Sequence, residues 1–444
     1  MPSPGRTQDR EILRLAVPAF LALVAEPLFL LADAAILGRL GTAQLAALGV
    51  ASAVLGTLIS LCIFLAYGTT ASVARQLGAG AERRALAQGI DGLWLAVVLG
   101  ALVTAVTWPL TSRIVDLFGS DRETTAFAVT YLEIALLGTV PLLLMLAATG
   151  VLRGLQDTRT PLAVAVAGNL LNIVLNLVLV YGFGLGMAGA ALGTLVAQLG
   201  SAAALVAVVV RGARRVEASL RPDLPGIRQA GRAGVPLVLR TLLLRASLLL
   251  MTAGAARLGR ADLATMQLAL TIWTFLAFAL DAVAIAAQAI TGRYLGAGDV
   301  EGARAVTKRM MRWGWLSGAS TGLLLAAAAP WLGLLFTSDP AVLDRLTPAL
   351  VVAALAQPLA GIVFVLDGVL IGAGDAVYLA WAQLATLIVF APAAIAVITR
   401  GEDLTGPGHG VALLWAAFGL LFMGGRAVTL LARARGPHWM RLGA

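Results

Sequence analysis

Charge is scarce in this sequence. Only 12% of its 444 residues are Asp, Glu, Lys or Arg, whereas 60% are hydrophobic and the mean hydropathy is +0.92. A soluble domain carries about 25% charged residues. The composition therefore excludes a soluble globular protein and predicts an all-α integral membrane protein. Lysine occurs once, at Lys308, and cysteine once, at Cys62, so an intrachain disulfide is excluded.

Signatures of catalysis and of nucleic-acid binding are also absent from the sequence. His409 and His438 are remote from Cys62, and neither a Walker A loop nor an HExxH segment occurs. We therefore predict no metal site, no cofactor and no enzymatic activity. The net charge of +9 is spread between apolar runs without interleaved aromatic side chains, which predicts no nucleic-acid partner. The expected partners are membrane lipid and a small molecule.

Hydropathy predicts twelve membrane spans. They cover residues 12–37, 46–70, 88–112, 130–150, 161–182, 187–210, 231–256, 265–291, 311–335, 345–372, 376–399 and 409–432. The first apolar run is too long for the core of a signal peptide, which has about 7–15 residues. Outside the spans, twenty-two Arg and Lys residues lie on the side of both termini and seven on the other side. This bias predicts a multi-pass protein with both termini in the cytoplasm.

The spans form two repeats of six. A shift of 218 residues places Val17–Pro18 on Val235–Pro236 and Arg39–Gly41 on Arg257–Gly259. The same shift aligns Arg75 with Arg293, LGAG at 77–80 with LGAG at 295–298, Leu117–Phe118 with Leu335–Phe336, Ser120–Asp121 with Ser338–Asp339, and Asp157 with Asp375. Because six is even, the halves share one membrane orientation, so their two-fold axis runs along the membrane normal. We expect six-helix bundles at 1–210 and 231–444, joined by a basic cytoplasmic linker at 211–230.

The first span carries two acids where a carboxylate is costly. Glu26 and Asp33 are seven residues apart, about two helical turns, and so share one face. A carboxylate at bilayer depth costs roughly 2.5 kcal/mol or more. Pro18 and Pro27 weaken the same helix, because each removes a backbone donor. A bendable helix with buried acids indicates ion-coupled transport; the alternative is that both acids are structural partners of arginine.

The fifth span carries a stripe of amides. Asn169, Asn172 and Asn176 recur at i, i+3 and i+7, and buried amides at this depth need polar partners. We expect the stripe to face Glu26 and Asp33, with Thr194 of the sixth span joining it. The alternative interpretation is that these residues only hold helices together.

The second half differs in its chemistry. Under the 218-residue shift, leucine and methionine stand where the first half has its two acids, and the seventh span carries Arg240 and Arg245 instead. Asp281, Gln288 and Asp367 are the other polar candidates, and we expect Arg245 to pair with Asp281 or Asp367. A paired aspartate stays ionised and is structural or contacts substrate, whereas an unpaired one can exchange protons. Asp33 is therefore the better proton carrier.

These features resemble the multidrug and toxic compound extrusion (MATE) family, in particular its DinF-type branch. The resemblance is carried by EPLxxLADxxxLGRLGTxxLAALG at residues 26–49, by LGAG after the second and eighth spans, by LDGVLIGAGD at residues 366–375, and by the repeated six-span layout. It covers residues 12–432.

The resemblance implies a V-shaped pair of six-helix bundles and a cation-driven efflux antiporter of the bacterial cytoplasmic (inner) membrane. In matching positions, the coupling site comprises Asp33, Asn172, Asn176 and Thr194, and Pro18 is the bending proline. Many relatives carry Asp at the position of Asn176, so this chain lacks a second adjacent acid, which weakens a sodium site.

We therefore predict a monomeric, proton-coupled exporter of lipophilic or cationic small molecules. Asp33 carries the proton, with Glu26, Asn172, Asn176 and Thr194 around it and bending at Pro18 and Pro27. Substrate-cavity candidates are Asn169, Arg245, Asp281, Gln288 and Asp367. Sodium coupling and a flippase for lipids or lipid-linked precursors are the alternatives, and the identity of the substrate stays open.

Overall fold

The computed structural model describes residues 4–405 and 408–443, and in this part of the chain every regular element is a helix, joined to the next by short turns. It divides into two compact units. The N-unit comprises Val17–Val235 with Gly443, and the C-unit comprises residues 4–16 with Pro236–Leu442. This division differs from the expected one at its edges. Residues 4–16 pack with the second half, while the linker and the start of the seventh span pack with the first.

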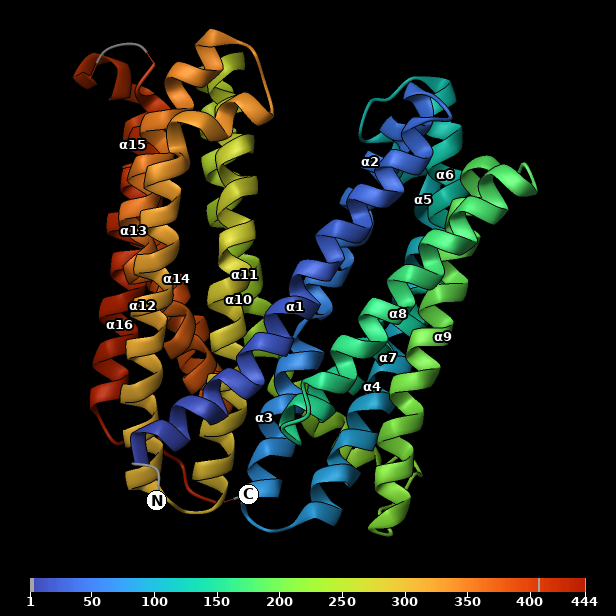
Figure 1. Cartoon of the computed structure of the whole chain (residues 1–444), viewed down its shortest axis with the longest axis vertical. Helices are drawn as coiled ribbons and strands as arrows, with labels where there is room; N and C mark the ends of the chain where they lie inside the picture. Colours follow the sequence, from blue (N-terminus) through green and yellow to red (C-terminus); the bar gives the residue numbers. More distant parts are fainter. Residues whose placement is uncertain (1–3, 406–407, 444) are drawn as a thin grey trace. The chain divides into compact units, whose positions relative to one another are not determined.

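The N-unit contains the blue-to-green helices of Figure 1. They are α1 (Pro4–Gly38) from Val17 onward, α2 (Thr42–Cys62), α3 (Phe64–Gly78), α4 (Glu82–Thr107), α5 (Thr111–Asp116), α6 (Arg122–Leu137), α7 (Thr139–Gly154), α8 (Arg159–Asn176), α9 (Gly186–Arg215) and the first turns of α10 (Leu224–Leu258). A 3-10 turn, η1 (Trp108–Leu110), precedes α5, and a π-helical turn, η2 (Leu177–Gly182), follows α8.

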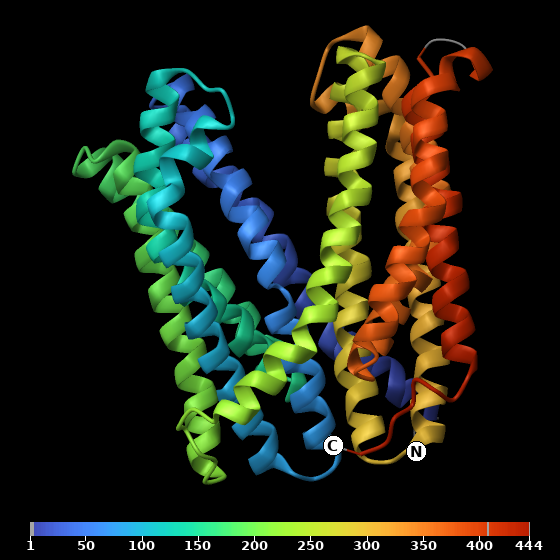
Figure 2. The ribbon, with the colours of Figure 1, turned by 180° about the vertical axis from the view of Figure 1, so that it is seen from behind.

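The C-unit contains the yellow-to-red helices, seen from behind in Figure 2. They are the rest of α10, α11 (Arg260–Gly296), α12 (Val300–Leu332), α13 (Pro340–Gly372), α14 (Ala376–Thr405), α15 (Gly410–Ala417) and α16 (Gly424–Arg435). A 3-10 turn, η3 (Gly333–Leu335), ends α12, and a π-helical turn, η4 (Phe418–Met423), joins α15 to α16. The most extensive packing in this unit is that of α13 against α11 and α12.

The helices have the length and composition expected of membrane spans. Within the described residues, eleven continuous helical stretches are long and apolar enough to cross a bilayer. The pair α6 and α7, bent by 49° at the break between them, makes a twelfth if it is one span. The predicted all-α membrane fold is therefore confirmed. Within the described part, no group of three or more His, Cys, Asp or Glu residues could hold a metal ion.

The 218-residue repeat is visible in the packing of glycines. Gly150 and Gly154 of α7 approach the backbone carbonyls of Ala66 and Thr70 on α3, where a Cβ would collide with them. The positions 218 residues later repeat this arrangement: Gly368 and Gly372 of α13 approach the carbonyls of Ala284 and Gln288 on α11. The GxxxG spacing thus serves close helix packing in both units.

The polar landmarks of the repeat are helix termini. Asp121 and Asp339 cap α6 and α13, each accepting hydrogen bonds from backbone N–H groups of the first turn. Gly41 and Gly259 precede α2 and α11 with φ of 156° and 147°, values that L side chains rarely adopt. The aspartates and glycines that the two halves share therefore lie at helix starts and turns that occur in both halves.

Candidate functional site

Asp33 lies inside the N-unit and is hydrogen-bonded to an amide. Its side chain, near the C-terminal end of α1, is 3% exposed. Asn176 Nδ2, on the last turn of α8, donates to Asp33 Oδ1 at 2.7 Å. Among the described residues, no Arg, Lys or His forms an ion pair with Asp33. Asp33 is thus a buried acid with a neutral partner.

A chain of hydrogen bonds continues from Asp33 across α8 to α9. Asn176 Nδ2 also donates to Asn172 Oδ1 at 2.9 Å, and Asn172 Nδ2 donates to Thr194 Oγ1 at 2.9 Å. Thr194 donates in turn to the carbonyl of Ala190, one helical turn earlier. Asn172 and Asn176 are almost fully buried. The structure thus brings Asp33, Asn172, Asn176 and Thr194 together, as the spacing of the amides and the family resemblance led us to expect.

The amide stripe of α8 contacts α1 at a second point. Asn169 Nδ2 donates to the carbonyl of Ala25 at 3.1 Å, one residue before Glu26. The stripe therefore faces α1, as expected from its helical spacing. Glu26 itself is exposed, and its side chain forms no hydrogen bond or ion pair within the described chain. The two acids of α1 consequently have different environments, although they were expected to share one face.

Pro18 and Pro27 both lie within α1, which runs from Pro4 to Gly38. Pro18 stands two residues after Ala16, the last residue of this helix that packs in the C-unit. Pro236, its equivalent in the repeat, is likewise the first residue of α10 that belongs to the C-unit. Both prolines thus mark the places where the first helix of a repeat leaves one unit for the other.

Two tyrosines and a glycine complete the site and were missed from the sequence. Tyr131 of α6 is buried close to Thr194 and Asp33. Tyr181 Oη, in η2, donates to the carbonyl of Ile36 at 2.5 Å. This hydrogen bond links η2 to α1 close to Asp33. Gly193 of α9 leaves room for Asn176, because a Cβ there would collide with Asn176 Oδ1. None of the three belongs to a periodic polar pattern that could have revealed it.

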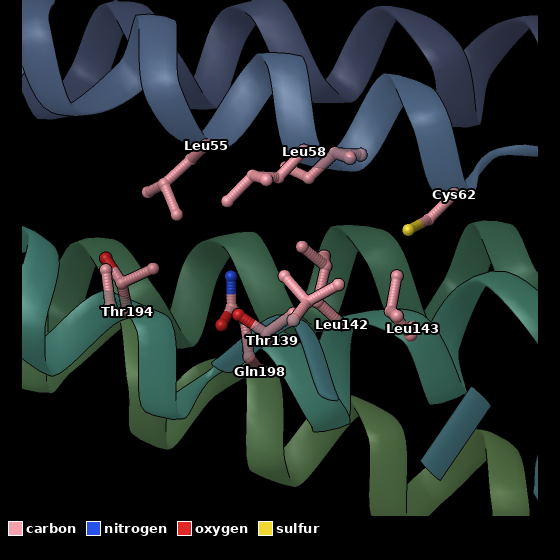
Figure 3. A pocket seen from close by; sticks show the side chains of 11 residues that line it. Leu55, Leu58, Cys62, Thr139, Leu142, Leu143, Thr194 and Gln198 are labelled. Carbon is pink, nitrogen blue, oxygen red and sulfur yellow. The ribbon is translucent and has the colours of Figure 1, made fainter. Parts of the chain in front are cut away.

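A small cavity adjoins this polar chain. Its volume is about 40 Å³, and Thr194 and Gln198 of α9 lie on its wall with Thr139 of α7. Figure 3 shows these polar side chains across from Leu55, Leu58 and Cys62 of α2. One water needs roughly 10–15 Å³ of such space, whereas pockets for drug-sized ligands have volumes of about 300 Å³ or more. The cavity is thus sized for a few waters.

The C-unit holds a different polar cluster, built from charges. Arg240 Nη2 of α10 donates to Asp367 Oδ2 of α13 at 2.8 Å, and Arg426 Nη2 of α16 donates to both carboxylate oxygens of Asp367. All three side chains are buried or nearly so. Asp367 is therefore an ion-paired acid, unlike Asp33, and Arg426 is a partner that the sequence pattern did not reveal.

The other polar candidates of the second half do not belong to this charge cluster. The predicted pairing of Arg245 is wrong: this side chain is exposed and has no ion-pair partner in the described chain. At 100° per residue, Arg240 and Arg245 point about 140° apart, so α10 cannot turn both toward α13. Gln288 is buried where α11 packs on Gly372, and Asp281, on the same helix, is half-buried.

Comparisons with known proteins agree with this picture. A sequence model of the MatE family matches residues 18–178 and again residues 236–395. The chain is 30% identical to Protein DETOXIFICATION 44, chloroplastic, of Arabidopsis thaliana, over 96% of this chain and 82% of the relative. It is 28% identical to DNA damage-inducible protein F of Escherichia coli (strain K12), over 98% and 93% of the two chains. The probable multidrug resistance protein NorM of Thermotoga maritima is 26% identical, over 82% and 80%.

Solved structures share the fold. A mutant of the Vibrio cholerae MATE transporter VcmN superposes with a TM-score of 0.87 at 22% identity, over 98% of this chain and 99% of that one. A crystal structure of MATE in the straight conformation gives 0.85 at 22% identity, over 98% and 95%. The family match, together with the membrane-length helices, defines a multi-pass membrane transporter and not an enzyme. The chain belongs to the MatE family, whose members are multidrug and toxic compound efflux transporters.

Proposed function

We propose that this transporter exports lipophilic or cationic small molecules in exchange for protons, and that Asp33 carries the proton. The observation that carries the proposal is the hydrogen bond from Asn176 to the buried Asp33, which has no ion-pair partner among the described residues. A carboxyl group with no cationic partner can change its protonation state, whereas an ion-paired one is held ionised. The neighbouring acid Glu26 is the second candidate for proton exchange, since it lies two turns away on the same helix.

Protonation changes what Asp33 can do in its hydrogen bonds. The ionised group only accepts, whereas the protonated group also donates one hydrogen bond. Asn176 Oδ1 is a buried acceptor without a partner in the described chain, so it can receive that new donor. The amide chain through Asn172 and Thr194 then rearranges. The first helix bends at Pro18 or Pro27 in response, since a proline weakens the helix there.

One proton supplies enough free energy for useful export. A motive force of about 150 mV corresponds to roughly 3.5 kcal/mol per charge. At about 1.4 kcal/mol per factor of ten, this sustains a gradient of a few hundred-fold for a neutral substrate. The small cavity beside Thr194 and Gln198 is suited to waters that deliver the proton. A single carboxylate is therefore sufficient.

Sodium is the second candidate for the coupling ion. The oxygens of Asp33, Asn176 and Thr194 gather within one hydrogen-bonded chain, and hard cations prefer oxygen ligands. Only one of these residues is an acid, which favours a proton. Lipid flipping remains the other alternative, and the same proteoliposomes can test it.

The proposal also covers the location of the protein, its oligomeric state and its contacts with the substrate. We place the protein in the bacterial cytoplasmic membrane, as a monomer with both termini in the cytoplasm. Asn169 in the N-unit and Asp281 in the C-unit are proposed to contact the substrate. Asp367 and Gln288 are candidates whose buried positions favour structural roles, and Arg245 is an exposed candidate. A cationic substrate fits a path that presents acids between apolar walls.

The decisive experiment measures efflux of a cationic dye from proteoliposomes in which the proton and sodium gradients are set independently. We expect wild-type export to follow the proton gradient and the variant Asp33→Asn to lose it. Asp116→Asn, which removes an exposed acid at the end of α5, serves as the matched control. Proton-driven export retained by Asp33→Asn would overturn the role of Asp33. Export that follows only the sodium gradient would overturn proton coupling.

A further inference from the structure

The segment between α9 and α10 carries an unusual density of arginine. Residues 211–232 contain six arginines and two acids. The arginines are Arg211, Arg214, Arg215, Arg221, Arg228 and Arg232, and all six are exposed. Within the described chain, none of them forms an ion pair. Their charge is therefore available to an anionic partner.

This basic segment is held in place by α4. Trp94 Nε1 donates to the carbonyl of Leu220 at 3.1 Å, and Asp91 Oδ1 accepts from the backbone N–H of Asp223 at 3.4 Å. Asp223 in turn accepts from the N–H of Gly226 at 3.1 Å and so caps α10. One of the two acids is thereby occupied by the helix terminus. The linker presents a fixed surface and not a loose tail.

An open hollow lies along the first turns of α10. Its volume is about 710 Å³, and its wall consists of Leu224, Pro225, Arg228, Gln229, Arg232 and Ala233. Arg228 and Arg232 are four residues apart, so they share one face of the helix. The wall therefore combines two cationic side chains and an amide with apolar side chains at both ends. The hollow is placed where the polar linker passes into an apolar membrane span, Leu224–Leu258.

We propose that this hollow binds the headgroup of an anionic membrane phospholipid. Arg228 and Arg232 contact its phosphate, since guanidinium groups bind phosphate oxygens with two parallel hydrogen bonds. Gln229 supplies a neutral donor for the glycerol or headgroup hydroxyls. Leu224, Pro225 and Ala233 contact the first carbons of the acyl chains. Clusters of four to eight basic residues beside a membrane span have this preference for anionic lipids.

The site is tested by native mass spectrometry of the purified full-length chain with added phosphatidylglycerol or phosphatidylcholine. Wild type is expected to retain phosphatidylglycerol preferentially. The variant Arg228→Gln/Arg232→Gln is expected to bind it roughly thirtyfold more weakly. Arg83→Gln/Arg84→Gln removes the same charge from an exposed arginine pair at the start of α4 and is the matched control. It is expected to bind as wild type does.

A third variant and a competitor separate the remaining explanations. Arg228→Lys/Arg232→Lys keeps both charges and is expected to restore at least half of the lost affinity, which reports charge recognition in a folded protein. Equal lipid binding by the glutamine variant and wild type overturns the site. Equal weakening in the Arg83/Arg84 control overturns it as well, because only total charge then matters. Displacement of the lipid by millimolar inorganic phosphate overturns the assignment to a lipid.

Discussion

Asp91 and Arg309 occupy equivalent positions in the two repeats, and each holds the beginning of a helix. Arg309 Nε of α12 donates to Asp9 Oδ1 at 2.6 Å, in the first turns of α1. Asp91 of α4, 218 residues earlier, accepts from the N–H of Asp223, which caps α10. The same position of the repeat thus stabilises the start of a helix in each unit. The residue at this position is an arginine in the C-unit and an aspartate in the N-unit.

The contact of Arg309 with Asp9 is expected to stabilise the C-unit measurably. It involves two N–H donors of Arg309, and Trp313 Nε1 donates to the same carboxylate at 2.8 Å. Because both charged side chains are a quarter to a third exposed, we expect a coupling free energy of about 1 kcal/mol. A double-mutant cycle with Asp9→Asn and Arg309→Gln, followed by denaturant unfolding in detergent, measures it. Arg304→Gln, an exposed arginine on the same helix, should be neutral, and a coupling near zero contradicts the prediction.

A methyl group at residue 193 should disable the site without touching Asp33. A Cβ on Gly193 lies 3.3 Å from the backbone N of Asn176 and collides with its Oδ1. Gly193→Ala therefore displaces the amide that donates to Asp33. We expect proton-driven efflux to fall at least tenfold in folded protein. Gly200→Ala, on the same helix with its nearest neighbour 3.9 Å away, should export normally. Similar export by both variants would contradict this account.

Much of the site could be predicted because a bilayer restricts which residues can be polar. Asp33, Asn172 and Asn176 stand out in apolar helices, and the 3.6-residue period places the two amides on one face. Tyr131 could not be found in this way, since a single tyrosine in a membrane helix has no periodic signal. Gly193 was hidden for the same reason, as small residues are abundant throughout this sequence.

Contacts between distant segments were harder to predict than spans. Hydropathy located the spans because each must bury about 20 apolar residues. It carries no information on which arginine meets Asp367, so Arg426 was not assigned and Arg245 was wrongly expected to pair. The packing of residues 4–16 with the second half was missed too, since Asp9 and Arg309 are 300 positions apart.

Helix α6 should lose part of its stability in acid. Asp121 accepts from the backbone N–H groups of Glu123 and Thr124 and from the Thr124 hydroxyl, which holds its pKa below the usual range. A lowered folded-state pKa stabilises the protein above the unfolded-state pKa of about 3.9, and this contribution disappears as the pH falls through the folded-state pKa. Asp121→Ala should thus lower the melting temperature at pH 7, and the difference from wild type should shrink as the pH falls below the unfolded-state pKa of about 3.9. Asp116→Ala, at an exposed acid without a side-chain hydrogen bond in the described chain, is the control. A pH-independent difference contradicts the prediction.

A second acid at residue 176 should change the coupling ion. In Asn176→Asp, the new carboxylate faces Asp33 across the present 2.7 Å contact. Two carboxylates this close cannot both ionise unless a cation or a shared proton neutralises them. We expect efflux by Asn176→Asp to become dependent on the sodium gradient, measured in proteoliposomes at fixed pH. Asn169→Asp adds an acid to the same face of α8, beside Ala25, and should not acquire this dependence. Sodium-independent export by Asn176→Asp would show that two acids at this place do not suffice for sodium coupling.

The charge cluster of the C-unit is expected to be structural. Asp367→Asn leaves the buried guanidinium groups of Arg240 and Arg426 facing each other without the carboxylate between them. Removing one member of a buried charge cluster typically costs about 3–5 kcal/mol. The triple variant Arg240→Met/Asp367→Asn/Arg426→Met removes all three charges and should be more stable than Asp367→Asn alone. Arg245→Gln, at an exposed arginine of α10, is the control and should change the free energy of unfolding by less than about 0.5 kcal/mol. Denaturant unfolding and proton-driven efflux are measured on the same samples. Loss of efflux by Asp367→Asn at unchanged stability would instead assign Asp367 to substrate binding.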